Sequence, residues 1–189
     1  MLPKLDHLDL NIISQLNKNG RISITDLAKK VKSTRLTVSK RLQRLINEEM
    51  INVGGGLNLK KLGFKVANVG LELKSEPSRI KTETYLKDCP RVLAIYRTPG
   101  KANIHLTIWG EDEHTINSTI ESFRDLPNVD IIYIRYLGTP IHGNIIINVA
   151  PGNKDETPCG KKCTECYKFE NAWCLGCPIS KHYKNPLLK

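Results

Sequence analysis

Hydrophobic positions in the first fifty residues recur at steps of three and four, the spacing of one buried helix face. The spacing predicts three short helices, over residues 5–16, 24–31 and 34–48. Asn19-Gly20 supplies a stop for the first helix, and Ser23 and Ser33 are N-cap residues for the second and third. Three short helices with a tight second connection predict a helix-turn-helix domain over residues 1–50.

From residue 65 to residue 149 the pattern changes to strand, helix, strand, strand, helix, strand. Ala67, Val69 and Leu71 alternate at period two, as a half-buried strand requires. The elements that follow are expected at residues 78–88, 92–98, 104–109, 116–123 and 129–137. This order predicts an α+β chain with a ferredoxin-like βαββαβ domain over residues 64–150. Residues 51–63 are expected to be a linker strand, and residues 144–149 an extra edge strand that swaps or caps the sheet.

The last strand of this domain has apolar residues on both faces. Ile132, Ile134 and Tyr136 alternate with Ile131 and Tyr133. Two helices can cover only one face of a four-stranded sheet, so the other apolar face requires a second covering partner.

Charge is distributed unevenly along the 189 residues, which carry a net charge of +10. Residues 1–63 contain 12 basic and 5 acidic residues, whereas residues 64–150 contain 10 of each. A cationic first third indicates contact with a polyanion, nucleic acid being the usual one, although a solvated lysine-rich surface gives the same charge. The sequence shows no signal peptide and no apolar run of membrane-spanning length, so we expect a cytoplasmic protein without membrane contact.

The outward face of the third predicted helix is cationic and polar. Val38, Leu42 and Leu45 point inward, which turns the basic and hydroxyl side chains to the opposite side. In a helix-turn-helix protein such a helix lies in the major groove of double-stranded DNA. The candidate DNA-binding residues are Ser33, Thr34, Arg35, Thr37, Lys40, Arg41, Gln43 and Arg44. A structural three-helix module with a solvated basic face is the alternative.

Five of the six cysteines lie in residues 151–189, a small cysteine-rich tail that begins with a polar linker. In a chain without a secretion signal, thiols this close in sequence indicate metal ligands before disulfides. The candidate ligands are Cys159, Cys163, Cys166, Cys174 and Cys177. The two CxxC pairs can close a tetrahedral zinc site. The spacing Cys-x3-Cys-x2-Cys also suits an iron–sulfur cluster, so both cofactors remain open.

The chain resembles the Lrp/AsnC (feast/famine) transcriptional regulators. The resemblance rests on Leu27-Ala28-Lys29-Lys30-Val31 and on residues 5–13, 19–23, 38–45, 50–51 and 59–63. It implies a winged-type helix-turn-helix domain followed by a dimerisation and effector domain. It also implies a homodimer formed through the sheets, further assembly up to an octamer, and a palindromic operator that matches the symmetry of the dimer.

In this family, effector amino acids bind at a hairpin loop that begins with a glycine and carries an acidic residue about three positions later. Gly100 matches the glycine, and Asn103 stands where the acidic residue is expected. We take both as candidate effector-binding residues. The amide cannot supply the charge partner that an effector's ammonium group would need.

These observations predict a sequence-specific DNA-binding transcriptional regulator that responds to metal or redox state through its cysteine tail. One alternative is an amino-acid-responsive regulator of the same family with a purely structural zinc knuckle. Another is an enzyme similar to the siroheme decarboxylases, which resemble this architecture. Because the sequence shows no cluster of acid and base residues that would support turnover, we assign no catalytic residue and do not expect an enzyme.

Overall fold

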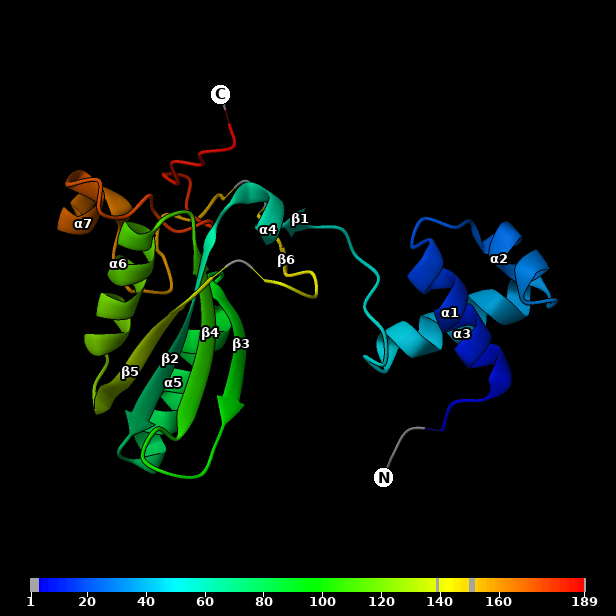
Figure 1. Cartoon of the computed structure of the whole chain (residues 1–189), viewed down its shortest axis with the longest axis horizontal. Helices are drawn as coiled ribbons and strands as arrows, with labels where there is room; N and C mark the ends of the chain where they lie inside the picture. The colour runs from blue at the N-terminus through cyan, green and yellow to red at the C-terminus, as the bar shows by residue number, and fades with distance from the viewer. Residues whose placement is uncertain (1–3, 139, 150–151, 189) are drawn as a thin grey trace. The chain divides into compact units, whose positions relative to one another are not determined.

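The computed structural model describes residues 4–138, 140–149 and 152–188 and, of residues 76–78, the backbone alone. It divides the chain into two compact units, residues 1–55 and 56–189, so the division falls inside the expected linker at residues 51–63. Each unit has its own hydrophobic core, and both are drawn in Figure 1. None of the helices in the described residues is long and apolar enough to cross a membrane.

The first unit is the predicted bundle of three helices. They are α1 (His7–Lys18), α2 (Ile24–Lys30) and α3 (Arg35–Asn47). Its core is built from the fully buried side chains of Ile12, Leu27, Val38 and Leu45, which lie on the apolar faces that the three- and four-residue spacing marks.

Each of the three helices begins at a side chain that accepts a backbone N–H. Ser23 caps α2 as expected, by accepting a hydrogen bond from the Asp26 N–H at 3.0 Å. The cap of α3 is Thr34 and not Ser33, which corrects the sequence prediction: the Thr34 hydroxyl oxygen accepts from the Thr37 N–H at 3.1 Å. Ser33 lies outside the helix, and its N–H donates to the Ala28 carbonyl in the turn between α2 and α3.

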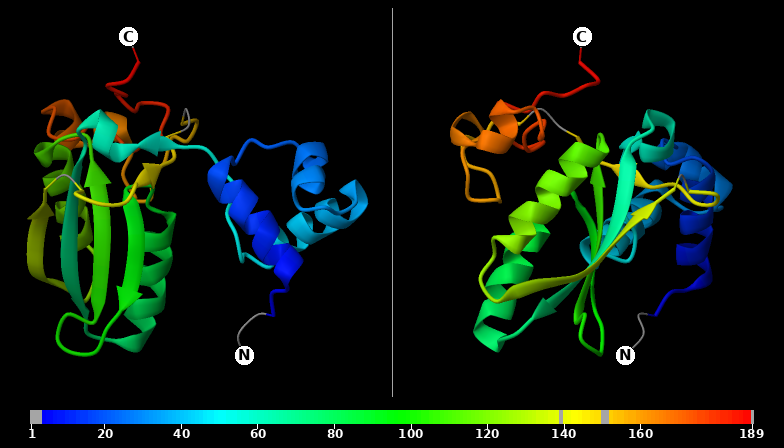
Figure 2. Two further views of the ribbon diagram at one scale, coloured as in Figure 1. Left: turned by 45° about the vertical axis from the view of Figure 1, so that its right-hand side comes forward. Right: turned by 60° about the vertical axis from the view of Figure 1, so that its left-hand side comes forward.

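The second unit contains a four-stranded antiparallel sheet. Its elements in chain order are β2 (Lys65–Leu73), α5 (Glu76–Asp88), β3 (Val92–Arg97), β4 (Ile104–Gly110), α6 (Glu113–Arg124) and β5 (Val129–Leu137). The strand order is β3-β4-β2-β5, with all neighbours antiparallel. Figure 2 shows α5 and α6 together on one face of the sheet. The predicted βαββαβ arrangement is therefore confirmed.

The core of this unit fills the space between the sheet and the two helices. The central strands contribute Val69 and Leu106, and α6 contributes Ile116 and Phe123, all at most 1% exposed. The Phe123 ring meets Tyr85 of α5 edge to face, with ring centroids 6.4 Å apart. This contact ties the two helices together above the sheet.

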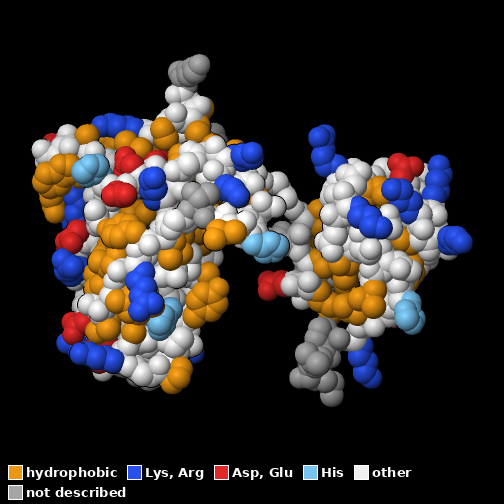
Figure 3. All heavy atoms as spheres, in the orientation of Figure 1, with side chains coloured by type: hydrophobic (Ala, Val, Ile, Leu, Met, Phe, Trp, Pro, Cys, Tyr) orange, Lys and Arg blue, Asp and Glu red, His pale blue; other side chains and the backbone are white. Residues whose placement is uncertain are grey.

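A bulge in the β2–β5 pairing changes the side chains expected on the uncovered face. The register shifts between Gly70 and Leu71, and as a result Ile131 and Ile134 both pack against the core. Tyr133 lies over Gly70, where an added Cβ would be 2.3 Å from its ring. The uncovered face is therefore mixed and not purely apolar as predicted. Figure 3 shows hydrophobic side chains gathered on the side of this unit that faces the viewer.

A second, two-stranded sheet lies at one end of this unit. It pairs β1 (Leu57–Asn58) with β6 (Ile146–Ile147), and α4 (Leu59–Leu62) follows β1 directly. Residues 144–149 do not cap the main sheet of their own chain as an edge strand, because their strand β6 pairs with β1. Ile147 packs instead in a cluster with Leu59 and Trp109, and the Phe64 ring stacks on Trp109.

The cysteine-rich tail belongs to the same compact unit as the sheet. Its described residues, 152–188, form little regular structure, namely η1 (Cys163–Glu165), α7 (Tyr167–Glu170) and two isolated bridges, Lys154 with Ser180 and Glu156 with Lys162. The Ser118 hydroxyl of α6 donates to the Trp173 carbonyl at 2.6 Å, which fastens the tail to the helical layer.

Leu106→Ala should lower the free energy of unfolding of the second unit by about 2–5 kcal/mol, because it opens a cavity in the middle of the sheet. Ile141→Ala is the control, since the Ile141 side chain is 99% exposed. Denaturant unfolding of the full chain, followed by the fluorescence of the buried Trp109, measures both effects. Equal stability of the two variants would contradict the core described above.

Candidate functional site

The outward face of α3 presents most of the candidate DNA-binding residues. Arg35, Lys40 and Gln43 are exposed. Leu36 in the same row is 66% exposed, although it is apolar. The Thr34 and Thr37 hydroxyls hydrogen-bond to each other at 2.9 Å at the start of the helix. The helix therefore offers cationic, amide and hydroxyl groups along one accessible side, the mixture that contacts DNA phosphates and base edges.

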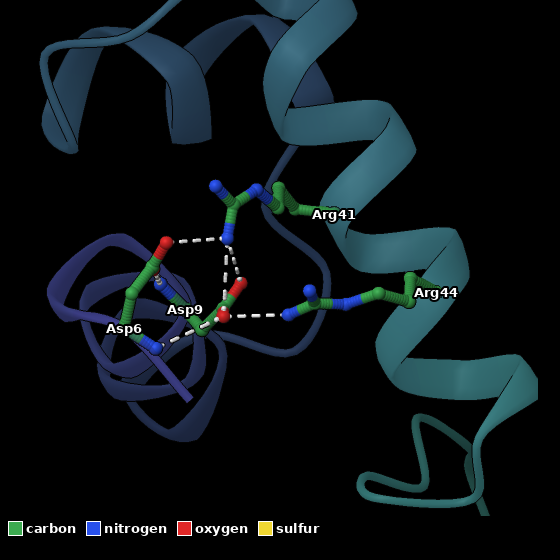
Figure 4. Close-up of polar contacts among 4 residues, drawn as sticks. All are labelled: Asp6, Asp9, Arg41 and Arg44. Atoms are coloured by element: carbon green, nitrogen blue, oxygen red, sulfur yellow. Dashed lines mark hydrogen bonds and ion pairs between the residues drawn. The ribbon is translucent and has the colours of Figure 1, made fainter. Parts of the chain in front are cut away.

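Two of the candidate arginines have partners inside the protein. Asp9 of α1 is 1% exposed, and its carboxylate accepts hydrogen bonds from Arg44 at 2.6 Å and from Arg41 at 3.2 Å. Arg41 also bonds Asp6 at 2.6 Å. Figure 4 shows the two guanidinium groups reaching from α3 to the start of α1. The sequence pattern of α3 indicates only DNA contact for Arg41 and Arg44 and does not reveal these ion pairs.

The same carboxylates cap α1. Asp6 accepts the Asp9 N–H at 2.9 Å, and Asp9 accepts the Asp6 N–H at 3.2 Å, which completes a capping box. The pKa of Asp6 is lowered by the hydrogen bond from the Asp9 N–H and then by the bond from Arg41. The pKa of Arg41 is raised by its hydrogen bonds to Asp6 and Asp9. The network thus ties α3 to the N-terminus of α1.

The two candidate effector residues lie in the loop between β3 and β4. Gly100 has φ +102°, which glycine adopts readily. The Asn103 side chain is bonded to the backbone of Leu73: its oxygen accepts the Leu73 N–H at 2.9 Å, and its NH2 donates to the Leu73 carbonyl at 3.1 Å. Asn103 therefore joins the end of β2 to the start of β4.

All six cysteines of the chain line one cavity of about 60 Å3. Five come from the tail, and the sixth, Cys89, lies directly after α5. The structure thus brings together the five predicted metal ligands and adds Cys89, which lies far from them in the sequence. None of the six forms a disulfide.

The thiols surround this cavity without closing on one point. Among the described residues, no three cysteine, histidine, aspartate or glutamate side chains are placed to hold a single metal ion. Residues of α6, including Ser118, Thr119 and Phe123, form part of the wall. The cavity is therefore shared between the tail and the helical layer of the sheet domain.

Arg91 fixes the wall of the cavity to the sheet. Its side chain is 4% exposed and donates to Glu111 at 2.7 Å and to the Gly176 carbonyl of the tail at 2.7 Å. The guanidinium carbon lies 5.2 Å from the centroid of the Trp109 ring. Burial is the largest single influence and lowers the pKa of Arg91, but the charge and the hydrogen bond of Glu111, with smaller contributions from Cys174 and Tyr183, together outweigh it, and the pKa is raised.

Lys168 of α7 is a second buried cation in the wall. The residue is 5% exposed, and its ammonium group donates to the Ser118 carbonyl at 3.3 Å. In the part of the chain that the structure describes, no carboxylate lies within ion-pair distance of this ammonium. Burying an ammonium group without an anionic partner costs free energy. An anion bound nearby would therefore stabilise this lysine.

The second CxxC pair is held in a turn. The Gly176 N–H donates to the Cys174 sulfur at 3.3 Å, and Gly176 has φ +89°. Burial raises the pKa of the Cys174 thiol and raises that of Cys177 to about 12. These thiols therefore stay protonated at neutral pH unless a metal ion displaces the proton.

Comparison with known proteins identifies the class of the first unit. Residues 5–52 match the family model for winged helix-turn-helix DNA-binding domains. The proline dehydrogenase transcriptional activator of Rhizobium radiobacter is 40% identical over 130 residues, which cover 66% of this chain and 83% of the activator. The transcriptional regulator LrpC of Bacillus subtilis is 29% identical over 122 residues, which cover 62% of this chain and 82% of LrpC.

Solved structures extend the likeness to the sheet domain. The B. subtilis LrpC structure has a TM-score of 0.60 and 26% identity, and the match covers 74% of this chain and 99% of LrpC. A Neisseria meningitidis transcriptional regulator in complex with L-Met has a TM-score of 0.64 at 18% identity, and covers 77% of this chain and 97% of that one. The chain belongs to the Lrp/AsnC family. It is a DNA-binding transcriptional regulator and not an enzyme.

Asp9→Ala should destabilise the helical unit by about 1–3 kcal/mol, because it removes the shared partner of two guanidinium groups. Residues 1–55 contain no aromatic side chain, so hydrogen exchange of the α1 and α3 amides in the full chain is the suitable measurement. Asp26→Ala, at an exposed carboxylate in the first turn of α2, should have a smaller effect. Equal protection in the two variants would show that the network is not needed to hold α3 on α1.

Proposed function

We propose that the chain is a homodimeric, sequence-specific transcriptional regulator in which α3 reads the major groove of double-stranded DNA and the cysteine tail makes this binding respond to metal or redox state. The observation that carries the first part is the exposed row on α3. Within the described residues, Arg35 and Lys40 have no ion-pair partner, so both are available to phosphates and bases.

The ion-pair network divides the candidate residues into two groups. Arg41 and Arg44 position α3 through Asp9, whereas Ser33, Thr34, Arg35, Thr37, Lys40 and Gln43 remain for DNA contact. The Gln43 amide, which bonds Asn47 at 2.8 Å on the exposed side, has the donor and acceptor needed to pair with adenine. A helix held at a fixed angle presents these groups with defined geometry.

The homodimer is proposed from the sheet. Its uncovered face carries the Tyr133 ring, the Thr107 hydroxyl bonded to Asn68 at 3.0 Å, and Tyr96, which is 58% exposed. A face that mixes aromatic rings with satisfied polar groups is suited to a second copy of itself across a twofold axis. Two copies would present two α3 helices to the half-sites of a palindrome.

The metal or redox response is proposed from the cysteine cavity. Thiolates bind zinc and iron–sulfur clusters, and five of the six lie on a tail that packs against α6. A change at the thiols therefore acts on a helix of the sheet domain, the same domain that we expect to form the dimer. This is the physical connection between the tail and the assembly that binds DNA.

A small-molecule effector is the second candidate signal. The Neisseria regulator that shares this fold was crystallised with L-Met, and Gly100 of this chain lies in the loop between β3 and β4, where the family resemblance places an effector. Isothermal titration calorimetry against the twenty amino acids decides this question. Heat of binding that is lost on replacement of Asn103 by Ala supports an amino-acid effector at the hairpin, and the absence of heat throughout the panel excludes it.

Lys40→Ala should weaken binding to all duplexes and reduce the slope of log K against log salt concentration by about 1, because one phosphate contact is lost. Lys18→Ala is the charge-matched control, since Lys18 is an exposed lysine in the last turn of α1. Fluorescence anisotropy with an operator selected from random duplexes measures both slopes. An unchanged slope for Lys40→Ala would remove this lysine from the interface.

Gln43→Ala should act differently from Lys40→Ala. Losing a bidentate contact to a base costs about 1–3 kcal/mol at one position of the operator and leaves non-specific binding intact. Binding to the selected operator and to single-base variants of it gives this pattern directly. A uniform loss across all sequences would show that Gln43 does not read a base.

A further inference from the structure

We infer that the cysteine cavity holds a cubane-type iron–sulfur cluster, ligated by four thiolates of the tail with at least one from each CxxC pair. The inference rests on the proposal that the tail binds metal and names the cofactor. Three observations carry it: the six thiols that line one cavity, the size of that cavity, and the sign of the charge around it.

The thiols line one shared space and do not converge on the position of a single ion. A tetrahedral zinc site needs four sulfurs at about 2.3 Å from one point. Six sulfurs line this cavity, yet within the described residues no three potential ligands are placed around a single-ion position. In a cubane cluster each thiolate binds a different iron atom at a corner, so the sulfurs stand farther apart around a common centre.

The volume of the cavity agrees with such an occupant. One water-sized occupant needs roughly 10–15 Å3, whereas this cavity measures about 60 Å3. It therefore has room for a group of several atoms. Its wall is closed on the side of the sheet domain by Tyr85 and Phe123, rings that would shield a cluster from water.

The charge around the cavity favours an anion. Three basic side chains, Arg91, Lys161 and Lys168, line it, and none of the described lining residues is a carboxylate. Arg91 is paired with Glu111 and Lys161 with Asp125, which leaves the Lys168 ammonium as the buried positive charge to be balanced. A cluster with four thiolate ligands is negatively charged, because the thiolates outweigh the charge of the core.

A local hydrogen bond fits the role of a tail sulfur as a cluster ligand. The Gly176 N–H points to the Cys174 sulfur at 3.3 Å. Donors directed at ligand sulfurs set the reduction potential of iron–sulfur clusters. The tail supplies five thiolates and a cubane needs four, so Cys89 is not required as a ligand.

The test is analysis of iron, acid-labile sulfide and zinc on the full chain purified without oxygen, together with its visible absorption and its electron paramagnetic resonance after reduction. We expect about four iron and about four sulfide per chain. The double variant C174S/C177S should lose both, and C89S should keep both. One zinc per chain without iron would overturn the cluster and leave a metal-binding tail, whereas a chain that takes up neither metal would overturn the metal-binding proposal as well.

A second measurement tests the cluster even if the double cysteine variant does not fold. Lys168→Gln removes the buried ammonium while keeping the cysteines, so it should shift the reduction potential of the cluster to more negative values. Lys162→Gln is the matched control, because Lys162 is half exposed and pairs with Glu165 at 3.5 Å. Equal potentials in the two variants would overturn the assignment of Lys168 as the charge partner of the cluster.

Discussion

The buried ion pair of Arg91 and Glu111 is the interaction on which the second unit depends. Both side chains are less than 5% exposed, and charges so deeply buried are tolerated only when every donor and acceptor is satisfied. Here Arg91 also donates to the tail at Gly176 and stacks on Trp109, while Tyr183 of the tail donates to Glu111. The ion pair of the sheet domain therefore depends on the tail, because without the tail it would lose two of its polar partners.

A second charged network has the corresponding role in the helical unit. Asp9 is nearly inaccessible, and it holds two arginines of α3 at the N-terminus of α1. In both units a buried carboxylate helps to hold a neighbouring element in place, α3 in one unit and the cysteine tail in the other. Buried charge adds less to stability than the same volume of apolar packing would. Here the buried ion pairs select one way in which α3 packs on α1 and the tail packs on the sheet domain.

The sequence predicted the elements well where the hydrophobic period was regular. The helices of the first unit and the βαββαβ order could be derived because one face of each element is apolar. The predictions from sequence were wrong where the structure depends on pairing between segments that lie far apart in the chain. The bulge at Gly70 and the pairing of β6 with β1 depend on contacts between distant segments. The same holds for the site: the spacing of Cys163, Cys166, Cys174 and Cys177 indicated thiolate ligands, whereas Cys89 and the partners of Arg44 could be found only in three dimensions.

We infer from these contacts that the cysteine tail and the sheet domain unfold as one cooperative unit. The most direct test is native-state hydrogen exchange of the full chain at increasing denaturant concentration. We expect the protected amides of α7, α6 and β4 to exchange through the same opening, with the same free energy and the same dependence on denaturant. Exchange of the tail amides through a separate opening of lower free energy would show that the tail is an independent appendage and would contradict the cooperative unit.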